Sequence, residues 1–246
     1  MEEMKSSTIE YKANLDEVSI IRPILITLVV LYHSMAIHTG NWALPDGVTV
    51  ISVYKAVGKL AYAFMLESFV FISGYVWAFQ RERRGRKESL GVLCRKKTIR
   101  LLVPNIVFGL LYCFLLEGGK LTILHLLEGP GHLWFLPMLF ECFLISWCIL
   151  KTKVPLRVIL PVLFIVGIIP PKDLPLRLSL TLYYLPFFML GYYMNGKYEK
   201  LKENIRIKHI LLTWFLFLIS YFSMVECRSL LVVRVHQPML LGGVFC

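Results

Sequence analysis

Two ionisable residues, Arg22 and His33, lie eleven positions apart inside one apolar run, residues 18–37. A run of this length is sufficient to cross a bilayer as a helix. Because eleven helical steps of about 100° come within roughly 20° of whole turns, the two side chains share one face, about 16 Å apart along the axis. Ionisable groups at such depths are costly and usually face a protein interior or a water-filled cavity, so they indicate a functional site.

Other polar side chains in the apolar runs admit more than one interpretation. His33 can act as a general base toward a hydroxyl, but a structural histidine hydrogen-bonded across helices explains its position equally well. His132, beside Trp134, is typical of an aromatic belt at the membrane interface, with catalysis as the second interpretation. Glu67 and Glu141 must be neutral, paired or facing water, and the sequence does not choose among these.

A basic group with two small residues nearby is the second candidate site. Lys97 and Arg100 precede one apolar run, Arg22 lies near the start of another, and Ser73 and Gly74 lie near the end of a third. Arginine binds phosphate through bidentate, charge-assisted hydrogen bonds, and glycine lets a ligand approach the backbone. The group therefore fits the nucleotide end of a coenzyme A (CoA) ester. The alternatives are that Lys97 and Arg100 only anchor a helix end by snorkelling and that Gly74 serves close helix packing.

The composition predicts an all-α, polytopic transmembrane helix bundle. Of the 246 residues, 57% are hydrophobic, and the mean hydropathy of +0.65 is too high for an ordinary soluble domain. The net charge of +11 does not indicate nucleic-acid binding, because the basic residues are concentrated in short segments between apolar runs. The six cysteines show no CxxC spacing, so we expect neither a disulfide framework nor a metal site.

The apolar runs predict about seven spans, within a range of six to eight, at residues 18–37, 57–79, 101–116, 132–150, 158–169, 178–194 and 209–225. Alternate connecting segments differ in charge: residues 81–100, 151–157 and 195–208 hold 17 Lys or Arg, whereas residues 38–56, 117–131 and 171–177 hold four. Because positively charged loops stay in the cytoplasm, we expect a multi-pass protein of the inner (plasma) membrane, in contact with lipid, with a cytoplasmic N-terminus. The basic group then lies at the inner face, and His33 lies in the outer half of its span.

Five motifs occur in order between residues 16 and 195. The first is the pair Arg22 and His33, with ten residues between them, and the second is 71–75 (FISGY). The others are 97–104 (KTIRLLVP), 132–137 (HLWFLP) and 185–191 (LPFFMLG). Each pattern is loose by itself, but together and in this order they resemble the acyltransferase-3 family of integral membrane sugar O-acyltransferases.

The resemblance implies an enzyme that moves an acyl group, commonly acetyl, from cytoplasmic acyl-CoA to a hydroxyl of a cell-surface carbohydrate, either a glycan or a lipid-linked sugar. His33 is then the catalytic base, and Arg22, Lys97 and Arg100 contact the CoA end of the donor. Acyl-CoA is a substrate, so no bound cofactor is expected. Because the family has about ten spans, the resemblance also implies one membrane-embedded domain over residues 1–246 that is incomplete at its C-terminal end.

Two other functions compete with this one. A transporter or flippase would use Arg22, His33, Glu67 and Glu141 as a path for substrate or protons, although no internal repeat favours it. A non-catalytic remnant of an acyltransferase would only pack against a partner. Binding of acyl-CoA separates the enzyme from the transporter, and turnover separates it from the remnant. The sequence indicates no particular oligomeric state.

Overall fold

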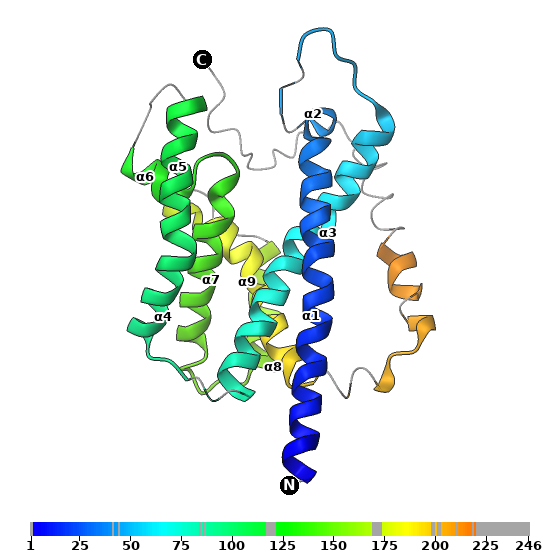
Figure 1. The fold of residues 1–246 in the computed structure, drawn as a ribbon, viewed down its shortest axis with the longest axis vertical. Helices are drawn as coiled ribbons and strands as arrows, with labels where there is room; N and C mark the ends of the chain where they lie inside the picture. The colour runs from blue at the N-terminus through cyan, green and yellow to red at the C-terminus, as the bar shows by residue number, and fades with distance from the viewer. Residues whose placement is uncertain are drawn as a thin grey trace. The chain divides into compact units, whose positions relative to one another are not determined.

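The computed structural model describes residues 2–40, 42, 43, 45–83, 85, 87–116, 122–168, 174–197, 200, 203–209, 211–217 and 219, with side chains from residue 18 onward except at 83 and 116 (Figure 1). These residues are mainly helical, and no strand occurs among them, so the prediction of an all-α fold is confirmed. The chain forms two compact units, Met1–Gly196 and Lys197–Cys246. The single domain over residues 1–246 stays a prediction.

The helices of the first unit are α1 (Glu2–Ser34), α2 (Ala36–Thr39), α3 (Ser52–Ala78), α4 (Leu90–Lys97), α5 (Val103–Leu116), α6 (Ile123–Glu128), α7 (Phe135–Ile149), α8 (Leu156–Ile168) and α9 (Leu178–Asn195). Short turns of other helix types are the π-helices η1 (Phe79–Arg83) and η2 (Thr98–Leu102) and the 3₁₀ turns η3 (Gly131–Trp134) and η4 (Pro175–Arg177). Because η1 continues α3 and η2 joins α4 to α5, two long helices run over residues 52–83 and 90–116.

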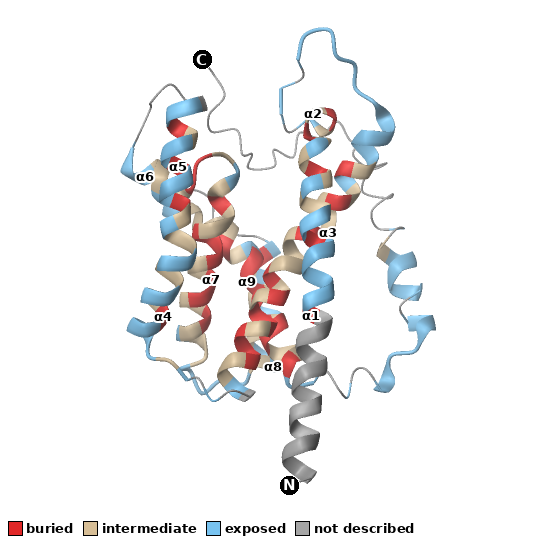
Figure 2. Ribbon diagram, in the orientation of Figure 1, coloured by how far each residue is buried: buried red, intermediate tan, exposed pale blue. Residues whose placement is uncertain are grey.

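Helix α9 packs against α3, α7 and α8 at once, and buried residues are concentrated along it (Figure 2). Its approach to α3 is the closest. A Cβ atom added at Gly74 of α3 would collide with the carbonyl oxygen of Phe188, and one added at Gly191 of α9 would collide with that of Phe71. Only glycine lets two backbones come this close. The glycines of the FISGY and LPFFMLG motifs therefore serve helix packing.

Large aromatic side chains fill the core where α3, α7 and α9 meet. The rings of Trp77 and Phe143 lie 5.6 Å apart, edge to face, and the rings of Phe143 and Phe188 lie 4.8 Å apart in the same manner. Tyr192 approaches Trp77 at 5.4 Å. Such pairs add about 0.5–1.5 kcal/mol each beyond the burial of their area. The core thus fixes the C-terminal end of α3, which continues into η1.

Helix α1 packs on α3 through one narrow stripe. Val18, Leu25 and Tyr32, spaced seven residues apart, are buried, as expected for a helix that packs mainly against one neighbour. The Tyr32 ring lies 4.8 Å from the ring of Tyr62 in α3. This contact fixes the end of α1, where His33 follows Tyr32.

Among the described residues, three stretches are long and apolar enough to span a membrane: Ser52–Glu82, Leu90–Leu115 and Gly131–Ile149. Shorter apolar helices cover Val18–Ser34, Leu156–Ile168 and Ile207–Phe217. These helices support a membrane protein, but seven spans are not confirmed. The predicted seventh span, residues 209–225, extends past the described residues after 219, and the predicted tail, 226–246, lies outside them.

Several boundaries differ from the sequence prediction. Helix α1 covers Glu2–Ser34, whereas the first span was predicted over 18–37. The helix predicted to begin at residue 101 begins at Leu90, because the basic residues before 101 lower hydropathy but are good helix formers. The segment 117–131, predicted as a loop, contains α6. Thr122 caps α6, since its hydroxyl oxygen accepts a hydrogen bond from the His125 backbone N–H at 3.2 Å.

Candidate functional site

Two histidines and a tryptophan from three separate elements meet in one group, the histidine cluster (His33, His132 and Trp42). The rings of His33 and His132 lie 4.9 Å apart at 87°. The Trp42 ring lies 5.1 Å from that of His132 and 6.1 Å from that of His33. The structure thus brings together two histidines that are 99 positions apart in sequence.

Local structure explains how each ring reaches the cluster. His33 lies in the last turn of α1, and Trp42 lies in the segment after α2. His132 belongs to η3, the turn that directly precedes α7. The first residue of η3 is Gly131, which has φ of 55°. A Cβ at Gly131 would come within 2.6 Å of the Tyr112 ring, so both the backbone conformation and the space require glycine there.

The proton of neutral His33 can be assigned from its hydrogen bond. Nδ1 lies 2.7 Å from the carbonyl oxygen of Val29. A carbonyl oxygen only accepts hydrogen bonds, so Nδ1 must carry the proton and donate it. In the neutral ring, Nε2 is therefore left with a lone pair, which is the form that a general base needs.

On a helical wheel of α1, Arg22 and His33 lie about 60° and 80° from the buried Leu25, on the same side of the buried stripe.

Both carboxylates inside the apolar helices accept hydrogen bonds from hydroxyls of α9. The Tyr183 hydroxyl donates to Oε1 of Glu67 at 3.3 Å, and the Thr181 hydroxyl donates to Oε2 of Glu141 at 2.5 Å. Oε2 of Glu67 is buried without a hydrogen-bond partner. Trp134 is buried and packs against Tyr184, with ring centres 6.0 Å apart. The structure therefore gives Trp134 a core position, while the site roles predicted for Glu67 and Trp134 stay predictions.

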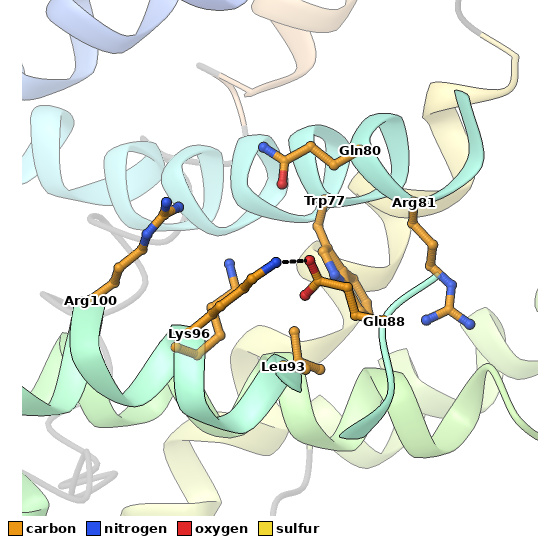
Figure 3. Close-up of a pocket in the computed structure, with 8 residues that line it drawn as sticks. Trp77, Gln80, Arg81, Glu88, Leu93, Lys96 and Arg100 are labelled. Atoms are coloured by element: carbon orange, nitrogen blue, oxygen red, sulfur yellow. Dashed lines mark hydrogen bonds and ion pairs between the residues drawn. The ribbon is translucent and has the colours of Figure 1, made fainter. Parts of the chain in front are cut away.

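A pocket of about 160 Å³, the basic pocket, lies between the C-terminal end of α3 and the helix that begins at Leu90 (Figure 3). Its lining consists of Trp77, Gln80, Arg81, Glu88, Leu93, Lys96, Lys97 and Arg100. Both π-helices contribute to it, η1 through Gln80 and Arg81 and η2 through Arg100. Such π turns are rare and frequently occur at functional sites, because they displace side chains from the regular helical positions.

The charge of the basic pocket is strongly unbalanced. Among its lining residues there are four cations and one carboxylate, that of Glu88, which pairs with Lys96. Glu82, beside the lining, pairs with Arg81, with 3.4 Å between Oε1 and Nε. Lys97 places its Nζ 3.4 Å from the centre of the Phe143 ring, and the Arg81 guanidinium lies 5.7 Å from that of Trp77. These aromatic faces hold two of the cations against the core. The excess of positive charge suits an anion with several negative groups.

The structure groups some of the sequence-predicted basic residues and separates others. Lys97 and Arg100 line the basic pocket, whereas Arg22 is exposed on α1 and is not part of the lining. The Ser73 hydroxyl donates to the carbonyl oxygen of Phe69, one turn earlier in α3, at 2.9 Å. Gly74 packs on α9, as described above. The donor-binding roles of Arg22, Ser73 and Gly74 stay predictions.

Sequence reasoning missed Trp42 of the histidine cluster and six of the eight residues that line the basic pocket, including Arg81 and Lys96. Arg81 and Lys96 belong to the most basic segment of the chain, 81–100, and its density of charge could have indicated them. Trp42 has no such signal, because it stands alone in a polar connecting segment. Only the tertiary structure brings its ring to the two histidines.

Comparison with protein families gave a match to a family model described as an acyltransferase domain, over residues 15–242. The matched range includes every residue of the histidine cluster and the basic pocket. Comparisons with curated proteins and with solved structures gave no match.

Proposed function

Because this chain belongs to the acyltransferase-3 family and is a membrane acyltransferase, we propose that it transfers an acyl group, most simply acetyl, from acyl-CoA to a hydroxyl of a cell-surface carbohydrate. The observation that carries the proposal is the pairing of a phosphate-suited pocket with a histidine whose Nε2 is available as a base. One group suits the charged end of the donor, and the other suits the reacting end.

The distance between the two groups suits a long donor. Tyr62 contacts Tyr32, the neighbour of His33, and Trp77 lines the basic pocket. Fifteen residues of α3 separate Tyr62 from Trp77, which corresponds to about 22 Å. Acyl-CoA carries its phosphates and its thioester at opposite ends of an extended pantetheine arm. With the phosphates bound by Arg81, Lys97 and their neighbours, the arm would follow the bundle toward His33.

In the proposed reaction, Nε2 of His33 accepts the proton of the acceptor hydroxyl as its oxygen attacks the thioester carbonyl. The carbon–sulfur bond breaks, and the CoA thiolate leaves. The proton held by His33 then passes to the thiolate, so the histidine returns to its neutral form. The Nδ1–Val29 hydrogen bond keeps the ring in the tautomer that this step needs and stabilises the transient imidazolium.

Charge asymmetry supports an orientation in the inner membrane with the N-terminus in the cytoplasm. The segments 81–100, 151–157 and 195–208 carry most of the Lys and Arg outside the apolar runs. Because such segments stay in the cytoplasm, the basic pocket would open where acyl-CoA is made. The histidine cluster would then meet the acceptor, a glycan or a lipid-linked sugar, toward the opposite face.

The test is acetyl-CoA turnover by the purified protein in detergent, measured as CoA release, together with equilibrium binding of CoA. We expect His33→Ala to lower kcat by about 10²–10⁴-fold, the usual contribution of a general base, while the Kd for CoA stays unchanged. His209→Ala, on an exposed helix of the second unit, serves as the matched control and should keep full activity. Turnover by His33→Ala within twofold of the wild type would refute the base assignment.

A further inference from the structure

Trp42 combines exposure with contact to both histidines of the cluster. Trp42 is 41% exposed, while its ring centre lies 5.1 Å from that of His132, with 38° between the ring planes. The described residues around it, from 45 to 51, are exposed as well (Figure 2). A large aromatic ring is therefore held beside a candidate base with much of its surface still open.

A second exposed aromatic residue shows what is particular to Trp42. Tyr54 is 43% exposed, and its ring lies 5.3 Å from that of His38. His38, however, is buried, and its Nδ1 accepts a hydrogen bond from the backbone N–H of Ile51 at 3.3 Å. His38 therefore has a structural role. At Trp42 the neighbouring histidines are His132, which is exposed, and the half-buried His33, whose neutral ring carries a lone pair on Nε2.

The chemistry of this surface fits a pyranose ring. One face of a pyranose presents C–H groups, which pack on the face of an indole, and its hydroxyls project from the rim. A ring stacked on Trp42 has its rim beside His33, because the two protein ring centres are 6.1 Å apart. One rim hydroxyl can then reach Nε2 at the about 2.6–3.2 Å that proton transfer requires. His132 borders the same surface and can donate or accept a hydrogen bond.

We propose that Trp42, bordered by His132, is the platform on which the pyranose ring of the acceptor stacks. Trp42 thereby selects cyclic over acyclic acceptors and turns a rim hydroxyl toward His33. This inference rests on the proposed acyltransferase function. It assigns a binding role to a residue of the polar connecting segment, where the sequence motifs give no signal.

The kinetic test uses acetyl-CoA as donor, with a panel of methyl hexopyranosides as cyclic acceptors and D-glucitol as an acyclic polyol. We expect the wild-type protein to acetylate a pyranoside in preference to the polyol. Trp42→Leu should raise the KM for that pyranoside about tenfold, as expected for the loss of a stacking contact. Tyr54→Leu is the matched control, because it removes an equally exposed aromatic ring from the neighbourhood of the other histidine.

Saturation-transfer NMR tests binding without turnover. In the wild type, saturation should concentrate on the C–H protons of one pyranoside face, and this pattern should disappear in Trp42→Leu but persist in Tyr54→Leu and His33→Ala. An unchanged pattern in Trp42→Leu, equal binding of D-glucitol, or no saturation of any pyranoside by the wild type would overturn the inference. The two measurements separate the two proposals. Face-specific binding of a pyranoside without acetyl-CoA turnover would contradict only the proposed acyltransferase activity. Turnover with the same KM for the pyranoside in Trp42→Leu as in the wild type would contradict only the stacking role of Trp42.

Discussion

The substitution Gly74→Ala tests whether the glycine of the FISGY motif packs helices or binds the donor. An alanine Cβ would lie 2.8 Å from the carbonyl carbon of Phe188 and 3.2 Å from its Cα, besides its collision with the carbonyl oxygen. Non-bonded carbons prefer about 3.5–4.0 Å, so α3 and α9 would have to separate by about 1 Å. Overpacking of this kind usually costs about 1–3 kcal/mol.

The assay is thermal unfolding of the purified protein in detergent. For a chain of this size each kcal/mol shifts Tm by about 2–4 °C, so we expect Gly74→Ala to lower Tm by about 2–12 °C. Gly91→Ala is the control, because a Cβ at Gly91 of α4 would meet nothing within 4 Å. Alanine there should leave Tm unchanged or raise it, since glycine inside a helix is destabilising by about 0.5–1 kcal/mol relative to alanine.

The same variant decides between the two interpretations of Gly74. If packing is its role, the protein that remains folded keeps the wild-type KM for acetyl-CoA. An unchanged Tm together with a raised KM would refute the packing argument and favour donor binding. Gly191→Ala should reproduce the loss of stability, because its Cβ would collide with the Phe71 carbonyl oxygen from the opposite helix.

Further predictions concern the basic pocket and the half-buried carboxylate of Glu67. Lys97→Met keeps the packing on the Phe143 ring but removes the charge, so the KM for acetyl-CoA should rise about tenfold, whereas Lys153→Met in an exposed turn should have no effect. Raising the salt concentration from 0.05 to 0.5 M should increase the wild-type KM for acetyl-CoA by screening the pocket, and the increase should be smaller in Arg81→Gln; equal slopes would exclude Arg81 from donor binding. Tyr183→Phe removes the hydroxyl that donates to Glu67, which should destabilise the protein by about 0.5–1.5 kcal/mol in thermal unfolding, and the loss should be smaller when Glu67→Gln is also present.

Prediction from sequence succeeded where a property is local to one helix. The apolar runs located α3, α7, α8 and α9 to within a few residues, because burial in lipid or core demands apolar side chains in sequence. The predicted start of the third span at residue 101 was wrong, because the helix begins at Leu90, and hydropathy falls across a basic stretch that still favours helix. The number of spans was not confirmed, because length and composition of the described helices support only three.

The sequence by itself determined an all-helical membrane protein, its acyltransferase family and a common face for Arg22 and His33, because these depend on composition, motif order and helical period. Tertiary structure decided which distant residues meet. It joined His33 to His132 and Trp42, and it separated Ser73 and Gly74 from the pocket. The reason is that ring contacts and the close approach of two backbones depend on how helices pack against one another, and no local pattern in one helix records the identity of its neighbour.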